Sequence, residues 1–114
     1  MGDTGILLAT GDTYTAVDND TLRALTNADD YTKVVTSLCT GFVDLFFSNQ
    51  IFNQDIGSWD TSNVTNMTAM FASASVFNQN LSGWCVSQIA TEPVNFSDGA
   101  TAWVLPKPNW GAPC

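Results

Sequence analysis

Two acidic side chains, Asp55 and Asp60, stand close together in the stretch FNQDIGSWDTSNVT at 52–65. A pair of carboxylates is what glycoside hydrolysis requires, with one group as acid and the other as nucleophile or base. However, the positions 25 residues later hold Asn80 and Cys85, and the sequence contains no histidine to act as a general base or metal ligand. We therefore interpret both residues as solvated turn acids, and we expect no catalytic residue, no metal site and no cofactor.

Two other patterns suggest chemistry. The stretch DNDT at 18–21 begins like a calcium-binding loop, but the glycine and the distal glutamate of such a loop are missing. Threonine rows that could order water on a flat ice-binding face are broken in the third copy by Val86 and Ala90. These rows pair Thr36 with Thr61 and Thr40 with Thr65. Neither pattern predicts a site.

Amides and tryptophans recur at a spacing of 25 residues. They are Asn53 and Gln54, which return as Asn78 and Gln79, and Trp59, which returns as Trp84. Stacked amides can satisfy backbone groups of adjacent copies, as in an asparagine ladder, or they can form an exposed polar stripe that touches a ligand. The tryptophans either stack in a core or form an exposed aromatic stripe for carbohydrate or protein contact. We favour the structural role for both sets, and the ligand-binding alternatives stay open.

These recurrences belong to a longer internal repeat. Between residues 46–65 and 71–90, seven of twenty positions are identical. Repeats of this length are typical of solenoids, in which each unit buries its apolar side by stacking on its neighbours. The sequence predicts a single domain, 1–114, with an N-terminal cap at 1–30, repeats at 31–55, 56–80 and 81–100, and a C-terminal cap at 101–114.

The apolar spacing within a copy indicates two kinds of element. In the second copy it follows one face of a short helix, with Asn66 as the N-cap: Met67, Met70, Phe71 and Ala74. Residues 31–36 and their equivalents are β-branched or aromatic and favour a strand. A further helix is expected at 20–28, capped by Asp18, Asn19 or Asp20. The sequence therefore predicts an α/β solenoid of strand–turn–short-helix units between two caps.

The charge excludes several partners. Eleven acidic residues against three basic ones give a net charge of -8 at pH 7, and no Lys or Arg occurs between Lys33 and Lys107. Nucleic acids and anionic membrane surfaces are bound by clustered cations, so neither is an expected partner. No apolar stretch is long enough to span a bilayer. The amino-terminal MGDTGILLAT lacks a basic region, so we do not expect it to act as a signal peptide.

The stretch FNQDIGSWDTSNVTNMTAMF at 52–71 resembles the unit of the BspA-like family of bacterial surface proteins. The resemblance extends over residues 31–98, and YTAVDNDTLRAL and PNWGAPC are similar to that family's caps. It implies a right-handed leucine-rich-repeat-like solenoid and a cell-surface or extracellular location. It also implies adhesion or binding to a protein partner or a host matrix component. The third copy departs from the unit, because Glu92 replaces Met67.

We therefore expect a non-enzymatic repeat module of a bacterial surface or secreted protein. The alternative is a small hydrolase that acts on surface glycans, and a third interpretation is a structural protein with no ligand. An enzyme needs polar residues that converge at one unrepeated site, whereas here the polar residues recur with the repeat. We also expect a homo-oligomer formed through the solenoid edges, because open edges template pairing.

The three cysteines differ in their alignment. Cys39 aligns with Val64 and Ile89, so we expect it to be buried and unpaired. Cys85 stands at a variable position, and Cys114 follows the proline-rich tail. A disulfide between these two would pin the tail across the last copy, and the cap cysteines of the resembled family suggest the same pairing. Such a bridge implies an oxidising compartment.

Overall fold

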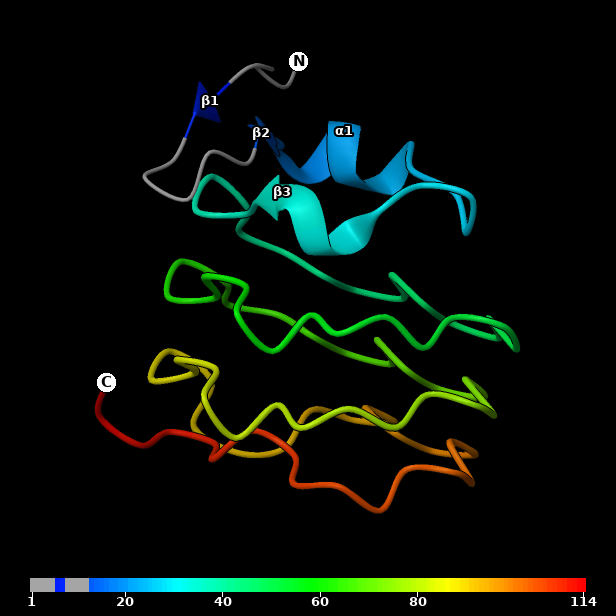
Figure 1. Ribbon diagram of the computed structural model, residues 1–114. Coiled ribbons are helices and arrows are strands. Elements are labelled where there is room, and N and C mark those ends of the chain that lie inside the picture. Colours follow the sequence, from blue (N-terminus) through cyan, green and yellow to red (C-terminus); the bar gives the residue numbers. More distant parts are fainter. Residues whose placement is uncertain (1–5, 8–12) are drawn as a thin grey trace.

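The computed structural model describes residues 6–7 and 13–114 (Figure 1). Its regular elements lie at the amino-terminal side: strands β1 (Ile6–Leu7), β2 (Thr13–Ala16) and β3 (Val34–Val35), helix α1 (Asn19–Arg23) and the 3-10 helix η1 (Tyr31–Lys33). They form a small sheet in the order β1-β2-β3. β1 and β2 pair antiparallel, whereas β2 and β3 run parallel, with Thr15 opposite Val34.

Helix α1 begins at a capping box. The Asp18 carboxylate accepts a hydrogen bond from the Thr21 amide at 2.9 Å, and the Thr21 hydroxyl accepts one from the Asp18 amide at 2.8 Å. Leu22 faces inward and is buried. The expected helix at 20–28 is shorter than predicted, because a turn follows in which Asp29 donates to the Thr26 carbonyl and accepts from its amide.

The expected fold class is wrong. It was an α/β, right-handed leucine-rich-repeat-like solenoid of strand–turn–short-helix units. After Val35, the described chain contains no helix and no strand, only one isolated parallel bridge between Gly41 and Asn66. The strand expected at 31–36 is divided between η1 and β3, and the helix expected at 67–74 is a run of turns.

Three runs of turns, which we call the turn segments, lie side by side in the right-hand part of Figure 1. They are residues 42–49, 67–74 and 93–100. Every second amide donates to the carbonyl three residues back, as Met70 does to Met67 at 3.2 Å. In the first two segments the amides between these donate to the next segment, as Phe71 does to Phe96 at 2.9 Å. An α-helix would use both kinds of amide internally, so bonding between segments replaces the helix.

Each turn segment holds two residues in the left-handed backbone region, at matching places. The pairs are Asp44 and Ser48, Ala69 and Ser73, and Asn95 and Gly99. Only glycine adopts this conformation freely, and other residues incur a cost of about 1 kcal/mol or more. The bonds between segments offset that cost, since Asp44 donates to Thr68 at 3.0 Å and Ser73 donates to Asp98 at 2.6 Å.

Aromatic rings, several of them at equivalent positions of the repeat, form a large part of the core. The centroids of Trp59 and Trp84 lie 6.3 Å apart with their planes 3° from parallel, and those of Phe46 and Phe71 lie 5.4 Å apart. All four rings are buried. Offset stacking of this kind stabilises a core beyond the area that it buries. The aromatic residues of successive copies therefore hold neighbouring segments together.

Acid should destabilise this fold at low pH. The Asp30 carboxylate accepts from the hydroxyl and amide of Thr32, and Asp60 accepts from those of Ser62, so each pKa lies below the ordinary value of 3.8. A lowered pKa contributes stability above the unfolded-state pKa, and that contribution is lost as the pH falls through the folded-state pKa. With no histidine to titrate, we expect a constant free energy of unfolding from about pH 5 to 8 and a decline below about pH 4, measured by urea titration. A decline that begins near neutral pH would contradict this explanation.

Candidate functional site

The two carboxylates that suggested hydrolysis act as turn acceptors. Asp55 accepts from the Gly57 amide at 3.0 Å, and Asp60 accepts from the Ser62 hydroxyl at 2.6 Å and the Ser62 amide at 3.0 Å. Both side chains are exposed, and the Ser62 bonds lower the pKa of Asp60, whereas a general acid needs a raised pKa. Among the described residues, no group of three or more acidic or cysteine side chains could hold a metal ion.

The tryptophans belong to the core, so the exposed aromatic stripe is wrong. Trp59 and Trp84 are 5% and 4% exposed. Each indole N–H donates to a main-chain carbonyl of the preceding copy at 2.9 Å, Trp59 to Tyr31 and Trp84 to Ile56. A third tryptophan, Trp103, does the same toward Gln79 at 3.0 Å. Each ring therefore fills the core, and its N–H satisfies a main-chain carbonyl that is buried or partly buried.

The four repeated amides bind the main chain of neighbouring segments. Gln54 accepts from the Tyr31 amide and donates to the Asp29 carbonyl, both at 2.8 Å. Asn53 accepts from the Asn78 amide at 2.8 Å and from the Gln79 side chain at 3.0 Å. Asn78 in turn accepts from the amides of Val104 and Leu105, both at 3.0 Å. The amides form a ladder, which is the structural role that the sequence favoured.

Replacing Asn53 by alanine tests that role. The change leaves the Asn78 amide without its acceptor and removes one of the two acceptors of the Gln79 side chain, which still donates to the main-chain carbonyl of residue 53. We therefore expect the free energy of unfolding to fall by about 1 kcal/mol. Urea titration measures this loss. Asn63→Ala, which removes a single side-chain donor, should lower the free energy of unfolding by less. An unchanged stability combined with the loss of a ligand would instead support the polar stripe.

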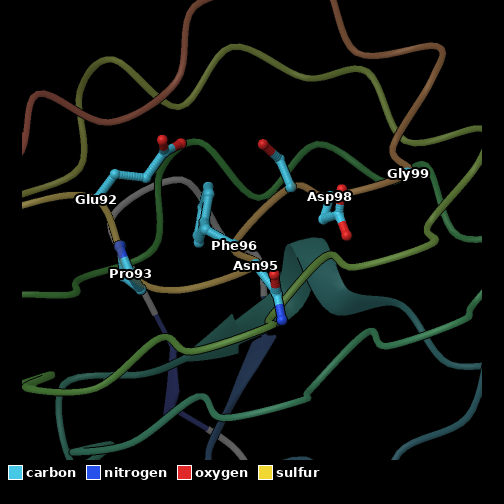
Figure 2. Close-up of a pocket in the computed structure, with 7 residues that line it drawn as sticks. Glu92, Pro93, Asn95, Phe96, Asp98 and Gly99 are labelled. Carbon is cyan, nitrogen blue, oxygen red and sulfur yellow. The ribbon is translucent and has the colours of Figure 1, made fainter.

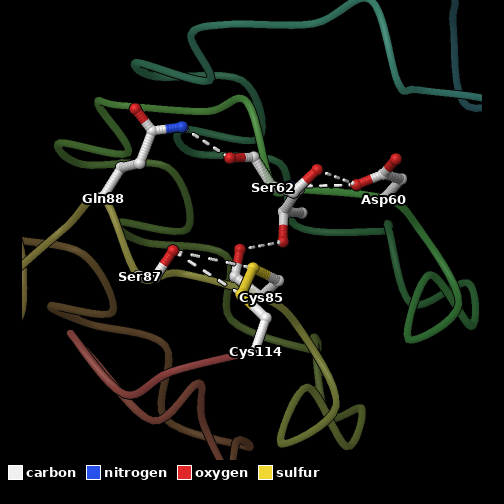
Figure 3. The surroundings of a disulfide bond; sticks show 7 residues. Asp60, Ser62, Cys85, Ser87, Gln88 and Cys114 are labelled. Atoms are coloured by element: carbon white, nitrogen blue, oxygen red, sulfur yellow. Dashed lines mark hydrogen bonds between the residues drawn. A yellow bond between two sulfur atoms is a disulfide. The ribbon is translucent and has the colours of Figure 1, made fainter.

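Sequence reasoning missed a second set of amide rungs. Asn63 donates to the Ser37 carbonyl at 2.9 Å, and Gln88 donates to the Ser62 carbonyl at 2.6 Å (Figure 3). The signal was available, because Asn63 and Gln88 are 25 residues apart and both are amides.

Thr61, from the row considered for ice binding, is buried, and its hydroxyl donates to the Cys85 carbonyl at 2.7 Å.

Cys85 and Cys114 are joined by a disulfide, with their Cα atoms 5.4 Å apart. Figure 3 shows Ser87 beside the bridge, with its hydroxyl 3.5 Å from the Cys114 sulfur. Cys39 is a free, buried thiol that donates to the Val17 carbonyl at 3.7 Å. Burial, and then the nearby charge of Asp18, raise the pKa of Cys39 to about 11, so this thiol is inert at neutral pH.

A hollow of about 390 Å³ lies on the third turn segment (Figure 2). It is lined by Glu92, Pro93, Asn95, Phe96, Ser97, Asp98 and Gly99. In the second segment the amides of Ala69, Phe71 and Ser73 donate to the third segment. The matching amides here, those of Asn95, Ser97 and Gly99, have no acceptor in the part of the chain that the structure describes. We call these three amides and the hollow the open edge.

The opposite edge is covered by the amino-terminal residues. Helix α1 lies above the first turn segment in Figure 1, and the Asn19 side chain accepts from the amides of Thr40 at 2.9 Å and Gly41 at 3.3 Å. Asn49 also donates to Asn27 at 2.8 Å. The open edge therefore lies at the far, carboxyl-terminal side of the stacked segments.

One family model matches residues 17–111, and its description is Mycoplasma protein of unknown function, DUF285. Neither the comparison with curated proteins nor that with solved structures found a match. Within residues 6–7 and 13–114, no helix has the length and apolar character that crossing a bilayer requires.

Proposed function

We infer a function from the premise that this chain belongs to the family of Mycoplasma proteins of unknown function, DUF285. The family assigns no activity, so the proposal rests on the open edge. The proposed function is non-enzymatic: the protein binds a segment of another polypeptide along the amides of Asn95, Ser97 and Gly99. These amides, which have no acceptor among the described residues, are the observation that carries the proposal.

The spacing of these donors defines what can bind. The second segment shows the pairing, because its amides at every second residue meet carbonyls at every second residue of the third: Val94, Phe96 and Asp98. In an extended chain, carbonyls two residues apart point to the same side. An extended partner segment presents carbonyls on one side at every second residue, so we infer that it accepts these bonds, as strands do at a free sheet edge, although the edge here is itself a run of turns and not a strand.

Hydrogen exchange provides the test. Peptides selected from a random display library on the folded protein should slow exchange at the amides of Asn95, Ser97 and Gly99, as measured by NMR. The amides of Phe71 and Ser73 are the internal control, because they are bonded with or without a peptide. Peptides that bind without protecting the open edge, or a library that gives no binder, would contradict the proposal.

The proposal includes a surface or secreted location and a relationship to BspA-like adhesion proteins. It is supported by the Cys85–Cys114 disulfide, because such bridges persist in oxidising compartments, and by the residues that resemble the BspA-like unit. A protein partner or a host matrix component fits that location.

The geometry gives the hydrolase alternative no comparable support, since Asp55 and Asp60 serve as turn acceptors. We expect the purified protein to release no product from surface glycans. Hydrolysis that Asp55→Asn abolishes would replace the binding proposal with an enzymatic one.

A further inference from the structure

We propose that the segment bound at the open edge carries lysine or arginine side chains. This inference rests on the proposed function, because it describes the partner of the same edge. Two carboxylates accompany the three amides: Glu92 and Asp98 line the hollow near opposite ends of a single stretch of chain (Figure 2). Both side chains are exposed.

The charge of the molecule favours a basic occupant. The chain carries a net charge of -8, and Lys107 is the first basic residue after Lys33. The Lys107 ammonium lies over the Trp103 ring, 4.8 Å from its centroid. A positive segment would gain from this field, whereas an acidic segment would be repelled by Glu92 and Asp98.

A second copy of the chain fits the edge poorly. Two copies with a net charge of -8 repel each other. At the far end of another molecule, the Asn19 side chain of α1 accepts from the Thr40 and Gly41 amides just before the first turn segment, and Asn49 of that segment donates to Asn27. The self-association expected from the sequence would bring this amino-terminal cover and a second charge of -8 against the open edge, whereas a foreign basic segment brings neither.

An extended partner can satisfy the amides and the carboxylates together. Its carbonyls lie in the plane of the new hydrogen bonds, while its side chains alternate above and below that plane. Every second side chain is thus free to reach Glu92 or Asp98 while the carbonyls accept from Ser97 and its neighbours. Exposed ion pairs of this kind are individually weak. The main-chain hydrogen bonds therefore supply most of the binding, and the ion pairs make the edge favour basic segments over neutral ones.

Three synthetic peptides test the inference. Each is an acetylated and amidated heptapeptide that alternates threonine with lysine, glutamine or glutamate. We expect the lysine peptide to bind about five- to tenfold more tightly than the glutamine peptide, as two exposed ion pairs allow, and the glutamate peptide to bind most weakly. The lysine advantage should shrink at high salt. Titration calorimetry measures affinity, and hydrogen exchange shows whether the open edge is occupied.

Matched variants locate the charges. Glu92→Gln and Asp98→Asn should each reduce the lysine advantage and leave the glutamine peptide unaffected. Asp44→Asn is the control, because it makes the same change of charge in the first turn segment, and asparagine tolerates the left-handed backbone there.

The outcomes separate the inference from the function. If lysine and glutamine peptides bind equally and both protect the three amides, the basic partner is wrong and the proposed function stands. If the lysine peptide binds without protecting them, or if no peptide binds, both are wrong. A dimer in sedimentation whose open-edge amides are protected would replace the basic segment with a second copy.

Discussion

Replacement of Phe71 by alanine should lower the free energy of unfolding by about 3–5 kcal/mol. The Phe71 ring is fully buried and lies 4.2 Å from Phe77, 5.0 Å from Trp103 and 5.4 Å from Phe46, measured between centroids. Removing it deletes the contacts among these rings and leaves a cavity. Because the surrounding rings come from different turns of the chain, the cavity cannot close by a local shift.

The matched control is Phe47→Ala, since Phe47 is 54% exposed and fills no comparable space. We expect that variant to differ from the native protein by no more than about 0.5 kcal/mol in urea titration. Equal losses in the two variants would mean that the aromatic core does not hold the turn segments together.

Loss of the disulfide should have a comparable effect. Cys85 and Cys114 are 29 residues apart, and closing a loop of that size contributes about 3–4 kcal/mol by restricting the unfolded chain. In Cys114→Ser the tail would be held by weaker contacts, including the Gly111 amide on the Val86 carbonyl at 3.2 Å and the Trp110 ring 4.8 Å from Phe96. We expect a lower unfolding midpoint in urea.

Reductant supplies the control for this variant. It should bring the native protein to the stability of Cys114→Ser and leave that variant unchanged. Cys39→Ala keeps the bridge, so its stability should still fall on reduction. If reductant does not change the unfolding midpoint of the native protein in urea, the disulfide contributes nothing to its stability.

The sequence predicted the contacts between equivalent side chains of successive copies better than it predicted the secondary structure of each copy. Trp59 and Trp84 pack on each other, and Asn53 bonds Asn78, because one spacing brings equivalent side chains together whatever element carries them. The helix expected at 67–74 failed, because its apolar residues are buried equally well by a run of turns. Hydrophobic spacing reports the buried face and not the hydrogen-bond pattern.

Two features had almost no signal in the sequence. The left-handed residues include Asp44 and Ala69, and only Gly99 among the six is a glycine, so turn chemistry did not reveal them. The open edge consists of main-chain amides, which every residue except proline has. One departure did point to it: Glu92 stands where the second copy has the buried Met67, and Glu92 lines the hollow.

The near absence of regular elements after Val35 also decides how this protein would appear by circular dichroism. Its far-ultraviolet spectrum should resemble that of an unfolded chain, because few of the residues that the structure describes are helical or in strands. Its near-ultraviolet spectrum should nevertheless be strong and structured, since Trp59, Trp84 and Trp103 are buried in fixed surroundings. Loss of the near-ultraviolet signal, and not of ellipticity at shorter wavelengths, is therefore the optical sign of unfolding in this molecule.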